Sequence, residues 1–238
     1  MKNVFLFACL AITMNCFAIG KNIKGNGILK SETRDIGAFT SLSSGGPMNV
    51  EITYGTSSNL TIEGDENILP YIETFVKNGT LKIKVKDLNT ISPRLKLKVQ
   101  ISMTTMSDIS QSGSGMISGR GNFENGKITN FNISGSGKID LAFAKFDGVN
   151  ISMSGSGSIE LKGDIDGDLD LHQSGSGFIN CLNAPCDNVS ANMSGSGTMK
   201  VNAAEIIDAH ISGSGEIYYT GTASISSHVS GSGHIRKV

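Results

Sequence analysis

Serine is the residue with potential chemistry that recurs most regularly in this sequence. The tetrapeptide Ser-Gly-Ser-Gly occurs seven times, and the copies start 18 to 22 residues apart, at Ser112, Ser134, Ser154, Ser174, Ser194, Ser212 and Ser230. A serine nucleophile needs a neighbouring base and a carboxylate that orients the base. Seven equivalent copies without such a matched set indicate a structural role. The motif also fits neither of the glycine patterns of nucleotide-binding loops.

A run of carboxylates is the second candidate for chemistry. Four aspartates alternate with apolar or small residues: Asp164, Asp166, Asp168 and Asp170. This alternation predicts four carboxylates on the outer face of one strand, and Ca²⁺ takes six to eight oxygen ligands. An EF-hand loop that began at Asp164 would need Gly at 169 and Glu at 175, where Leu169 and Gly175 stand. We favour a solvated acidic strand, with a calcium site as the alternative.

Histidines occur in a column two positions before each motif. Its members are Ser110, Asn132, Ser152, His172, Asn192, His210 and His228. We expect His210 and His228 to be neighbours, at a distance that two metal ligands could share. The column contains no Cys, Asp or Glu beside them, so we expect an exposed polar ladder, without a metal or a cofactor.

The residues around each motif identify the elements that carry these columns. Two places after the second glycine stand seven large apolar residues: Ile117, Ile139, Ile159, Ile179, Met199, Ile217 and Ile235. They alternate with polar residues, and a side-chain period of two indicates a β-strand. The glycines fall on the inward parity, where they permit a corner in each repeat: Gly135, Gly137, Gly155, Gly157, Gly175, Gly177, Gly195, Gly197, Gly213 and Gly215.

A repeat of this size cannot bury its apolar face alone, so the repeats are expected to stack. In a parallel β-helix, or solenoid, the isoleucine column becomes an internal ladder and the serine columns become external ones. Each buried Ile then contributes about 1.5 to 3 kcal/mol before entropy is counted. Leucine-rich repeats need a different consensus and propeller blades need about 40 residues, so both are disfavoured. The sequence predicts an all-β, single-stranded solenoid with coils of 18 to 22 residues.

Residues 31–110 lack the motif, but their pattern also predicts β-structure. Asn78-Gly79 separates two alternating runs, which is a strong hairpin signal. No linker is visible near residue 110, so this region is expected to continue the stack or to cap its first coil. We therefore expect one domain over residues 19–238, with an N-terminal β-hairpin region at 31–110 and the seven repeats at 111–238.

Composition and the N-terminus bear on location and partners. The chain has 238 residues and a formal net charge of −1, so no overall field attracts nucleic acid. Residues 1–18 contain one lysine followed by a short apolar run, which predicts a secretory signal peptide; acylation at Cys9 is the alternative. No later segment predicts a membrane span. In an exported chain Cys181 and Cys186 could form a disulfide, and a free core thiol at Cys181 is equally consistent.

Three stretches carry a resemblance to a known family. FTSLSSGGPMNVEITYG, LTIEGDENILPYIETFVKNGTLKIKV and the repeat series resemble the putative auto-transporter adhesin, head GIN domain family, over roughly residues 31 to 235. The resemblance implies a right-handed parallel β-helix in the periplasm, on the outer-membrane surface or outside the cell. It supplies no catalytic residues.

The sequence leaves three kinds of function open. The favoured hypothesis is a noncatalytic envelope module for adhesion or surface assembly, with a glycan or a surface protein as partner. A polysaccharide-acting enzyme is the alternative by fold analogy, but the coils are short and the chain has no Trp. The third hypothesis is a purely structural component of a homo-oligomer, because the ends of a β-helix expose strand edges.

Overall fold

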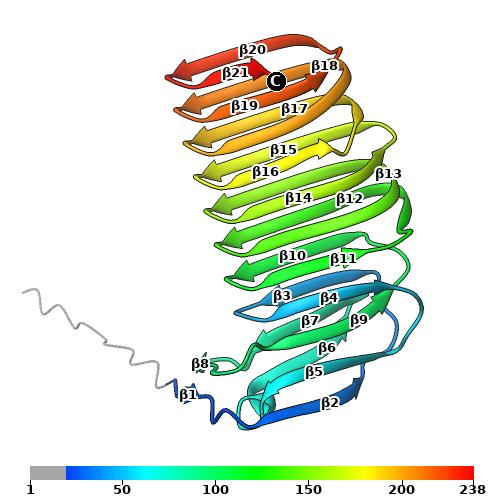
Figure 1. The fold of residues 1–238 in the computed structure, drawn as a ribbon, viewed down its shortest axis with the longest axis vertical. Coiled ribbons are helices and arrows are strands. Elements are labelled where there is room, and N and C mark those ends of the chain that lie inside the picture. Colours follow the sequence, from blue (N-terminus) through cyan, green and yellow to red (C-terminus); the bar gives the residue numbers. More distant parts are fainter. Residues whose placement is uncertain (1–19) are drawn as a thin grey trace, which may run out of the picture.

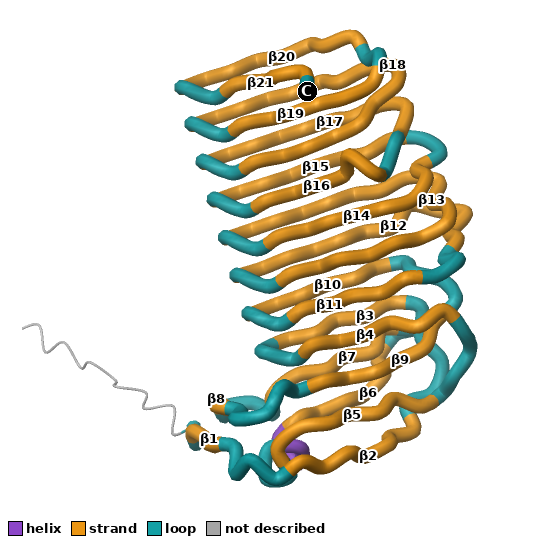
Figure 2. Tube along the Cα trace, viewed as in Figure 1, coloured by secondary structure: helices purple, strands orange, loops and turns teal. Residues whose placement is uncertain are grey.

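Glycine corners shape this fold. In the computed structural model, which describes residues 20–238, the first glycine of every motif has a positive φ, for example 112° at Gly175. Residues with a Cβ rarely adopt this conformation. A Cβ on Gly175 would also lie 2.5 Å from the carbonyl oxygen of Gly155 in the preceding coil. The chain therefore turns sharply at each motif, and the corners align along one side of the molecule (Figure 2).

The two glycines of each motif do not behave alike. The second glycine, such as Gly137 or Gly177, is buried, whereas the first, such as Gly135 or Gly175, is exposed or partly exposed. The expectation that both glycines point inward is therefore wrong for the first one. The physical reason is its positive φ, which ends the alternation of the strand at the corner.

Each coil contributes one strand segment to each of two sheet faces (Figure 1). Sheet I consists, in spatial order, of β6 (Ile72–Lys77), β7 (Thr80–Val85), β3 (Ser41–Gly45), β10 (Asp108–Gly113), β12 (Glu124–Gly135), the second half of β13 (Lys138–Gly155), β15 (Asp168–Gly175), β17 (Cys186–Gly195), the second half of β18 (Thr198–Gly213) and β20 (Ser224–Gly231). The long strands β13 and β18 bend around the side opposite the corners and so join this sheet to the next.

Sheet II packs behind sheet I. Its strands, in spatial order, are β2 (Leu29–Asp35), β5 (Asn59–Asp65), β9 (Lys98–Met103), β4 (Asn49–Tyr54), β11 (Met116–Arg120), the first half of β13, β14 (Ser158–Ile165), β16 (Phe178–Asn183), the first half of β18, β19 (Glu216–Gly221) and β21 (His234–Lys237). From β9 onward all neighbours are parallel, and from β11 onward paired residues are about 20 positions apart in sequence. The prediction of a β-solenoid is confirmed.

The isoleucine column forms the centre of the core. Ile139 pairs with Ile159 and Ile159 with Ile179 in register, and all three side chains are fully buried. Ile235, in the last coil, is only partly buried. Close packing of isoleucine side chains, with Met199 in one coil, stabilises the stack by burial of apolar surface.

The N-terminal region both continues the stack and caps it. β3 and β4 form a coil in which Gly45-Gly46 replaces the Ser-Gly-Ser-Gly corner. Antiparallel strands then cover each sheet: β6 pairs with β7 through the Asn78-Gly79 turn, which confirms the predicted hairpin, and β2 pairs with β5. A 3₁₀ helix, η1 (Leu69–Tyr71), and a separate pair, β1 (Asn22–Lys24) with β8 (Thr90–Ser92), complete this end.

The predicted signal peptide, residues 1–18, lies outside the described residues. Within residues 20–238, no helix has the length and apolar character needed to cross a membrane.

Candidate binding groove

Two rows of polar side chains follow the outer face of sheet I. The serine ladder is the first serine of each motif: Ser112, Ser134, Ser154, Ser174, Ser194, Ser212 and Ser230. The mixed ladder lies two positions earlier in each strand: Ser110, Asn132, Ser152, His172, Asn192, His210 and His228. Strand register places equivalent members on neighbouring coils, as in the pair Asn132 and Ser152. The two ladders are therefore parallel to the solenoid axis.

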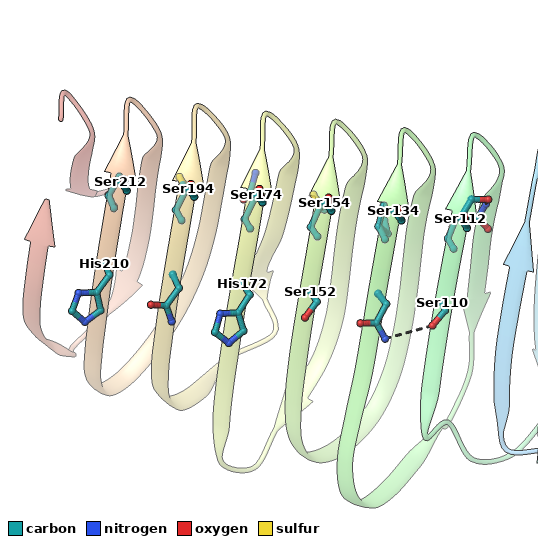
Figure 3. A pocket seen from close by; sticks show the side chains of 18 of the residues that line it. Ser110, Ser112, Ser134, Ser152, Ser154, His172, Ser174, Ser194, His210 and Ser212 are labelled. Carbon is teal, nitrogen blue, oxygen red and sulfur yellow. Dashed lines mark hydrogen bonds between the residues drawn. The ribbon is translucent and has the colours of Figure 1, made fainter. Parts of the chain in front are cut away.

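A groove of about 710 Å³ runs between the two ladders (Figure 3). Neighbouring coils lie about 4.8 Å apart, so six steps from Ser110 to His228 make the groove roughly 30 Å long. Its floor is the residue between the ladders in each strand, for example Ile133 and Met153. Their exposed fractions are only 2% and 3%, so the floor presents backbone while the side chains fill the core.

The polar groups of the ladders are largely free to meet a ligand. Among the described residues, one hydrogen bond joins two ladder side chains, from Asn132 Nδ2 to Ser110 Oγ at 3.4 Å (Figure 3). The serines of the serine ladder are all exposed. A hydroxyl can donate one hydrogen bond and accept two. The groove therefore offers repeated, uncommitted donors and acceptors at every coil.

A third row of polar side chains lies on the other side of the mixed ladder. In this row Asn130 Nδ2 donates to Asp108 Oδ1 at 2.9 Å, and Asn150 Nδ2 donates to Asn130 Oδ1 at 3.1 Å. These bonds connect successive coils and fix the side chains that border the mixed ladder. A smaller hollow of about 280 Å³ lies between the two rows, near Asp170 and His172.

The structure brings the predicted histidine pair together. The ring centroids of His210 and His228 are 6.2 Å apart, and His210 Nε2 lies 3.7 Å from Asp208 Oδ1. Across residues 20–238, however, no three His, Cys, Asp or Glu side chains are arranged to hold a metal ion. The pair belongs to the wall of the groove.

The four aspartates do not share one strand, so that expectation is wrong. β14 ends at Ile165, the chain bends at Asp166-Gly167, and β15 starts at Asp168. The cause is Gly167, whose φ is 147° and whose Cβ, if present, would lie 2.6 Å from the carbonyl oxygen of Asp147.

The aspartates on either side of Gly167 have different side-chain partners. Asp166 Oδ2 pairs with Lys145 Nζ at 2.6 Å, and Asp168 Oδ1 accepts a hydrogen bond from Asn188 Nδ2 at 2.9 Å. The side-chain hydrogen bond and the charge of Asp166 raise the pKa of Lys145. The structure therefore gives no support to a calcium site formed by Asp164, Asp166, Asp168 and Asp170.

The two cysteines are both free thiols inside the solenoid. Cys181 and Cys186 are buried and do not form a disulfide. Burial raises the pKa of Cys186 to about 12, and burial together with the neighbouring Cys186 raises the pKa of Cys181 further. Because the thiolate is the reactive form, neither thiol is suited to nucleophilic chemistry.

Sequence reasoning found the ladders but missed the groove. The alternation placed the mixed ladder and the serines outward, and an exposed polar ladder was expected without a groove beside it. The sequence feature that indicates the groove is the difference in side-chain size between the ladders. In most coils a small serine lies two positions after a larger Asn or His, as in His172 and Ser174. A row of small side chains beside a row of larger ones leaves a channel.

The fold and the groove define a β-solenoid module with a polar-walled groove along its axis. The sequence pattern of the family DUF2807, described as "Putative auto-transporter adhesin, head GIN domain", matches residues 38–223. The chain belongs to this family, and the resemblance seen in the sequence is confirmed. No curated protein matches the chain.

Solved structures show the same fold. A putative adhesin from Bacteroides fragilis NCTC 9343 is 27% identical with a TM-score of 0.79, covering 91% of this chain and 100% of its own. A putative lipid binding protein from Parabacteroides distasonis ATCC 8503 is 26% identical with a TM-score of 0.75, covering 91% of this chain and 99% of its own. A putative adhesin from the same P. distasonis strain, 21% identical with a TM-score of 0.68 over 91% of this chain and 100% of its own, is similar in fold.

Proposed function

We propose that this chain is a noncatalytic binding module of the bacterial envelope, and that its groove holds an extended polysaccharide chain parallel to the solenoid axis. The observation that carries this proposal is the groove itself, about 710 Å³ in volume and bordered by the two ladders. A site of this length and regularity suits a polymer better than a compact small molecule. Sugar units of an extended polysaccharide repeat at a spacing close to that of the coils.

The chemistry of the walls supports a polyhydroxylated ligand. Hydroxyl and amide groups dominate both ladders, and each of them can donate and accept hydrogen bonds. Sugar hydroxyls have the same dual character. Single contacts of this kind are weak, about 0.5 to 1.5 kcal/mol each, so binding depends on their repetition over several coils. Such binding favours long chains over short oligosaccharides.

A noncatalytic role is supported by what surrounds the hydroxyls. Within residues 20–238 no hydrogen bond joins a serine of the serine ladder to a histidine, and His210 Nε2 lies 3.7 Å from Asp208 Oδ1. Nucleophilic catalysis by serine needs a base within hydrogen-bond reach. The polysaccharide-acting enzyme of the sequence analysis therefore gains no support from the groove.

An envelope location is supported by two independent features. The chain belongs to the family described as "Putative auto-transporter adhesin, head GIN domain". The first 18 residues also have the charge and apolar pattern of a signal peptide. We infer export to the periplasm, the outer-membrane surface or the exterior.

A lipid acyl chain is the second candidate ligand, and two observations favour it. A structure that is 26% identical carries the description of a putative lipid binding protein. Carbon atoms contribute most of the groove surface. The two candidates differ in what they need: a lipid uses the floor, whereas a polysaccharide uses the ladder hydroxyls and amides.

Binding experiments with two blocking variants test the proposal. Ser154→Tyr and Ser174→Tyr each place a ring in the middle of the groove at an exposed position. Purified protein is applied to an array of long-chain bacterial and host polysaccharides, and the best ligand is then titrated by calorimetry. We expect saturable binding without release of oligosaccharides, and a loss of about tenfold or more in each blocked variant.

Ser156→Tyr is the matched control, since Ser156 is exposed in the same motif and does not line the groove. Its affinity should equal that of the unmodified protein. Release of oligosaccharides, or equal effects of all three variants, would overturn the proposal. Displacement of a fluorescent fatty acid by lipids, blocked by Ser154→Tyr and without polysaccharide binding, would establish the second candidate instead.

A further inference from the structure

A second cluster with binding chemistry lies on the outer face of sheet II, away from the groove. Lys200 in β18 pairs in register with Tyr218 in β19, and Tyr218 pairs with Arg236 in β21. Phe178 in β16 lies one coil before the Lys200 segment and is 37% exposed. Lys200, Tyr218 and Arg236 therefore form one column on three successive coils. Phe178 lies on the coil before them, in the column two residues away, where it pairs with Thr198.

The lysine of this cluster lies between the rings. Lys200 Nζ is 5.7 Å from the centroid of the Phe178 ring and 5.7 Å from that of the Tyr218 ring. Cations at this distance are attracted to the ring face, by about 0.5 to 1 kcal/mol at exposed sites. The Tyr218 hydroxyl donates to Glu216 Oε2 at 2.7 Å. The Tyr218 ring therefore has two partners, Lys200 and Glu216, before any ligand arrives.

The charges of this cluster are unlike those of the rest of the face. Nearer the N-terminus the lysines have carboxylate partners: Lys98 Nζ lies 2.8 Å from Glu51 Oε2, and Lys162 Nζ lies 2.9 Å from Glu160 Oε1. Within the described chain, neither Lys200 nor Arg236 takes part in an ion pair. The face therefore changes from paired charges to cations without an ion-pair partner, of which Lys200 lies over two rings.

We propose that Phe178, Lys200, Tyr218 and Arg236 form a second binding site, specific for acidic sugar residues of a polysaccharide. Aromatic rings supply apolar contact to the C–H faces of a pyranose, while Lys200 and Arg236 supply charge to a uronate carboxylate or a sulfate. A neutral polysaccharide would use the rings alone, and a simple anion would use the cations alone. Only an acidic sugar uses both.

The arrangement along the axis fits a polymer that runs across the coils. Tyr218 lies between Lys200 and Arg236 in one column, so each cation flanks the ring by a single coil spacing, about 4.8 Å. A sugar stacked on Tyr218 would place its substituents within reach of either cation. This site does not depend on the groove, because the two lie on opposite faces of the solenoid.

Glycan binding to acidic and neutral forms of one polymer tests the proposal. The probes are polygalacturonate, its fully methyl-esterified form, and an array of uronate-containing, sulfated and neutral glycans. We expect at least one acidic class to bind more tightly than its neutral counterpart. Tyr218→Ala and Lys200→Ala should each weaken that binding by about fivefold or more.

Two controls separate this site from non-specific charge effects and from the groove. Lys98→Ala removes a paired lysine of the same face and should leave acidic-glycan binding unchanged. Ser154→Tyr should block only the groove ligand. Tyr218→Phe keeps the ring and loses the bond to Glu216, so it should retain most of the affinity.

Three outcomes would overturn the proposal. They are absence of binding to every acidic glycan, equal loss in Lys98→Ala and Lys200→Ala, and binding to phosphatidylglycerol vesicles without binding to acidic glycans. The last result would assign the cluster to a membrane surface. If Ser154→Tyr and Ser174→Tyr bound the groove ligand normally, the proposed function would be wrong, but the predictions for Tyr218 would still hold. The two proposals can therefore be tested separately.

Discussion

Gly155 supports Gly175 at the corner of the next coil. The carbonyl oxygen of Gly155 accepts a hydrogen bond from the amide of Ser176 at 3.0 Å, and a Cβ on Gly175 would come within 2.5 Å of the same oxygen. Each corner is therefore built on the backbone of the corner before it. The spacing of the stack depends on the absence of side chains at these positions.

Gly175→Ala should destabilise the protein by about 2 to 4 kcal/mol, because it combines strain at φ 112° with a backbone clash. The difference in the free energy of unfolding in urea between the variant and the unmodified protein measures this loss of stability. Ser176→Ala, the next residue and an exposed one, should change stability by less than about 0.5 kcal/mol. Equal stability of the two variants would show that the corner can widen without cost.

Ile159→Ala should cost about 3 kcal/mol, because Ile159 is fully buried between Ile139 and Ile179 and the cavity cannot collapse against rigid strands. Ile235→Ala serves as the comparison, since Ile235 is partly buried in the last coil. Its cost should be about 1 kcal/mol. Thermal unfolding of both variants gives the difference, and a larger loss for Ile235 would contradict the assignment of the column as the main core.

Asp65 should make stability depend on pH. Burial raises the pKa of Asp65, but backbone hydrogen bonds from Leu95, Gly27 and Arg94 outweigh burial and hold it below the usual value. The folded state thus binds fewer protons than the unfolded state. The stabilisation is fully present above the unfolded pKa, about 3.9, and is lost as pH falls through the folded pKa.

Asp65→Asn measures this contribution. At pH 7 the variant should be less stable by about 2 kcal/mol, because an amide group replaces a carboxylate oxygen that accepts backbone bonds. The difference should shrink as pH falls below about 4. Melting temperatures of both proteins across this range provide the measurement, and a difference that is independent of pH would be inconsistent with a lowered pKa.

Gln173→Met should stabilise the protein by about 1 kcal/mol. Gln173 Nε2 donates to the Gly177 carbonyl at 2.5 Å, but Gln173 Oε1 is buried without a partner. Methionine occupies the equivalent place in the coils on both sides, at Met153 and Met193. Removing an unsatisfied buried acceptor is favourable. A lower free energy of unfolding in urea would show that the hydrogen bond to Gly177 stabilises the protein by more than the unpaired Gln173 Oε1 destabilises it.

Much of the fold follows from the sequence because its repeat makes local and long-range signals agree. Isoleucine recurs at the same offset from a glycine corner, so a period of two and a period of about 20 residues point to the same stacked coils. The Asn78-Gly79 hairpin follows from turn chemistry alone. Neither inference needs distant contacts.

The parts that sequence reasoning missed depend on backbone geometry. Gly167 splits the aspartate run, although alternation through Ile165 and Leu169 gives no sign of a bend. The groove depends on relative side-chain size across strands, which no single repeat contains. The cation–ring cluster joins Phe178 to Tyr218 across two coils and is visible only after stacking.

Among the seven repeats, coil length varies on the side of the molecule opposite the corners. The registers slip at four places on this side of the coils: between Asn125 and Ile128, between Ala142 and Lys145, between Glu160 and Lys162, and between Cys186 and Asn188. The ladders remain in step although the repeat shortens from 22 to 18 residues. A foreign peptide grafted into one of these segments would be displayed at a fixed height on the rod, which makes the protein a scaffold for presenting epitopes in an ordered array.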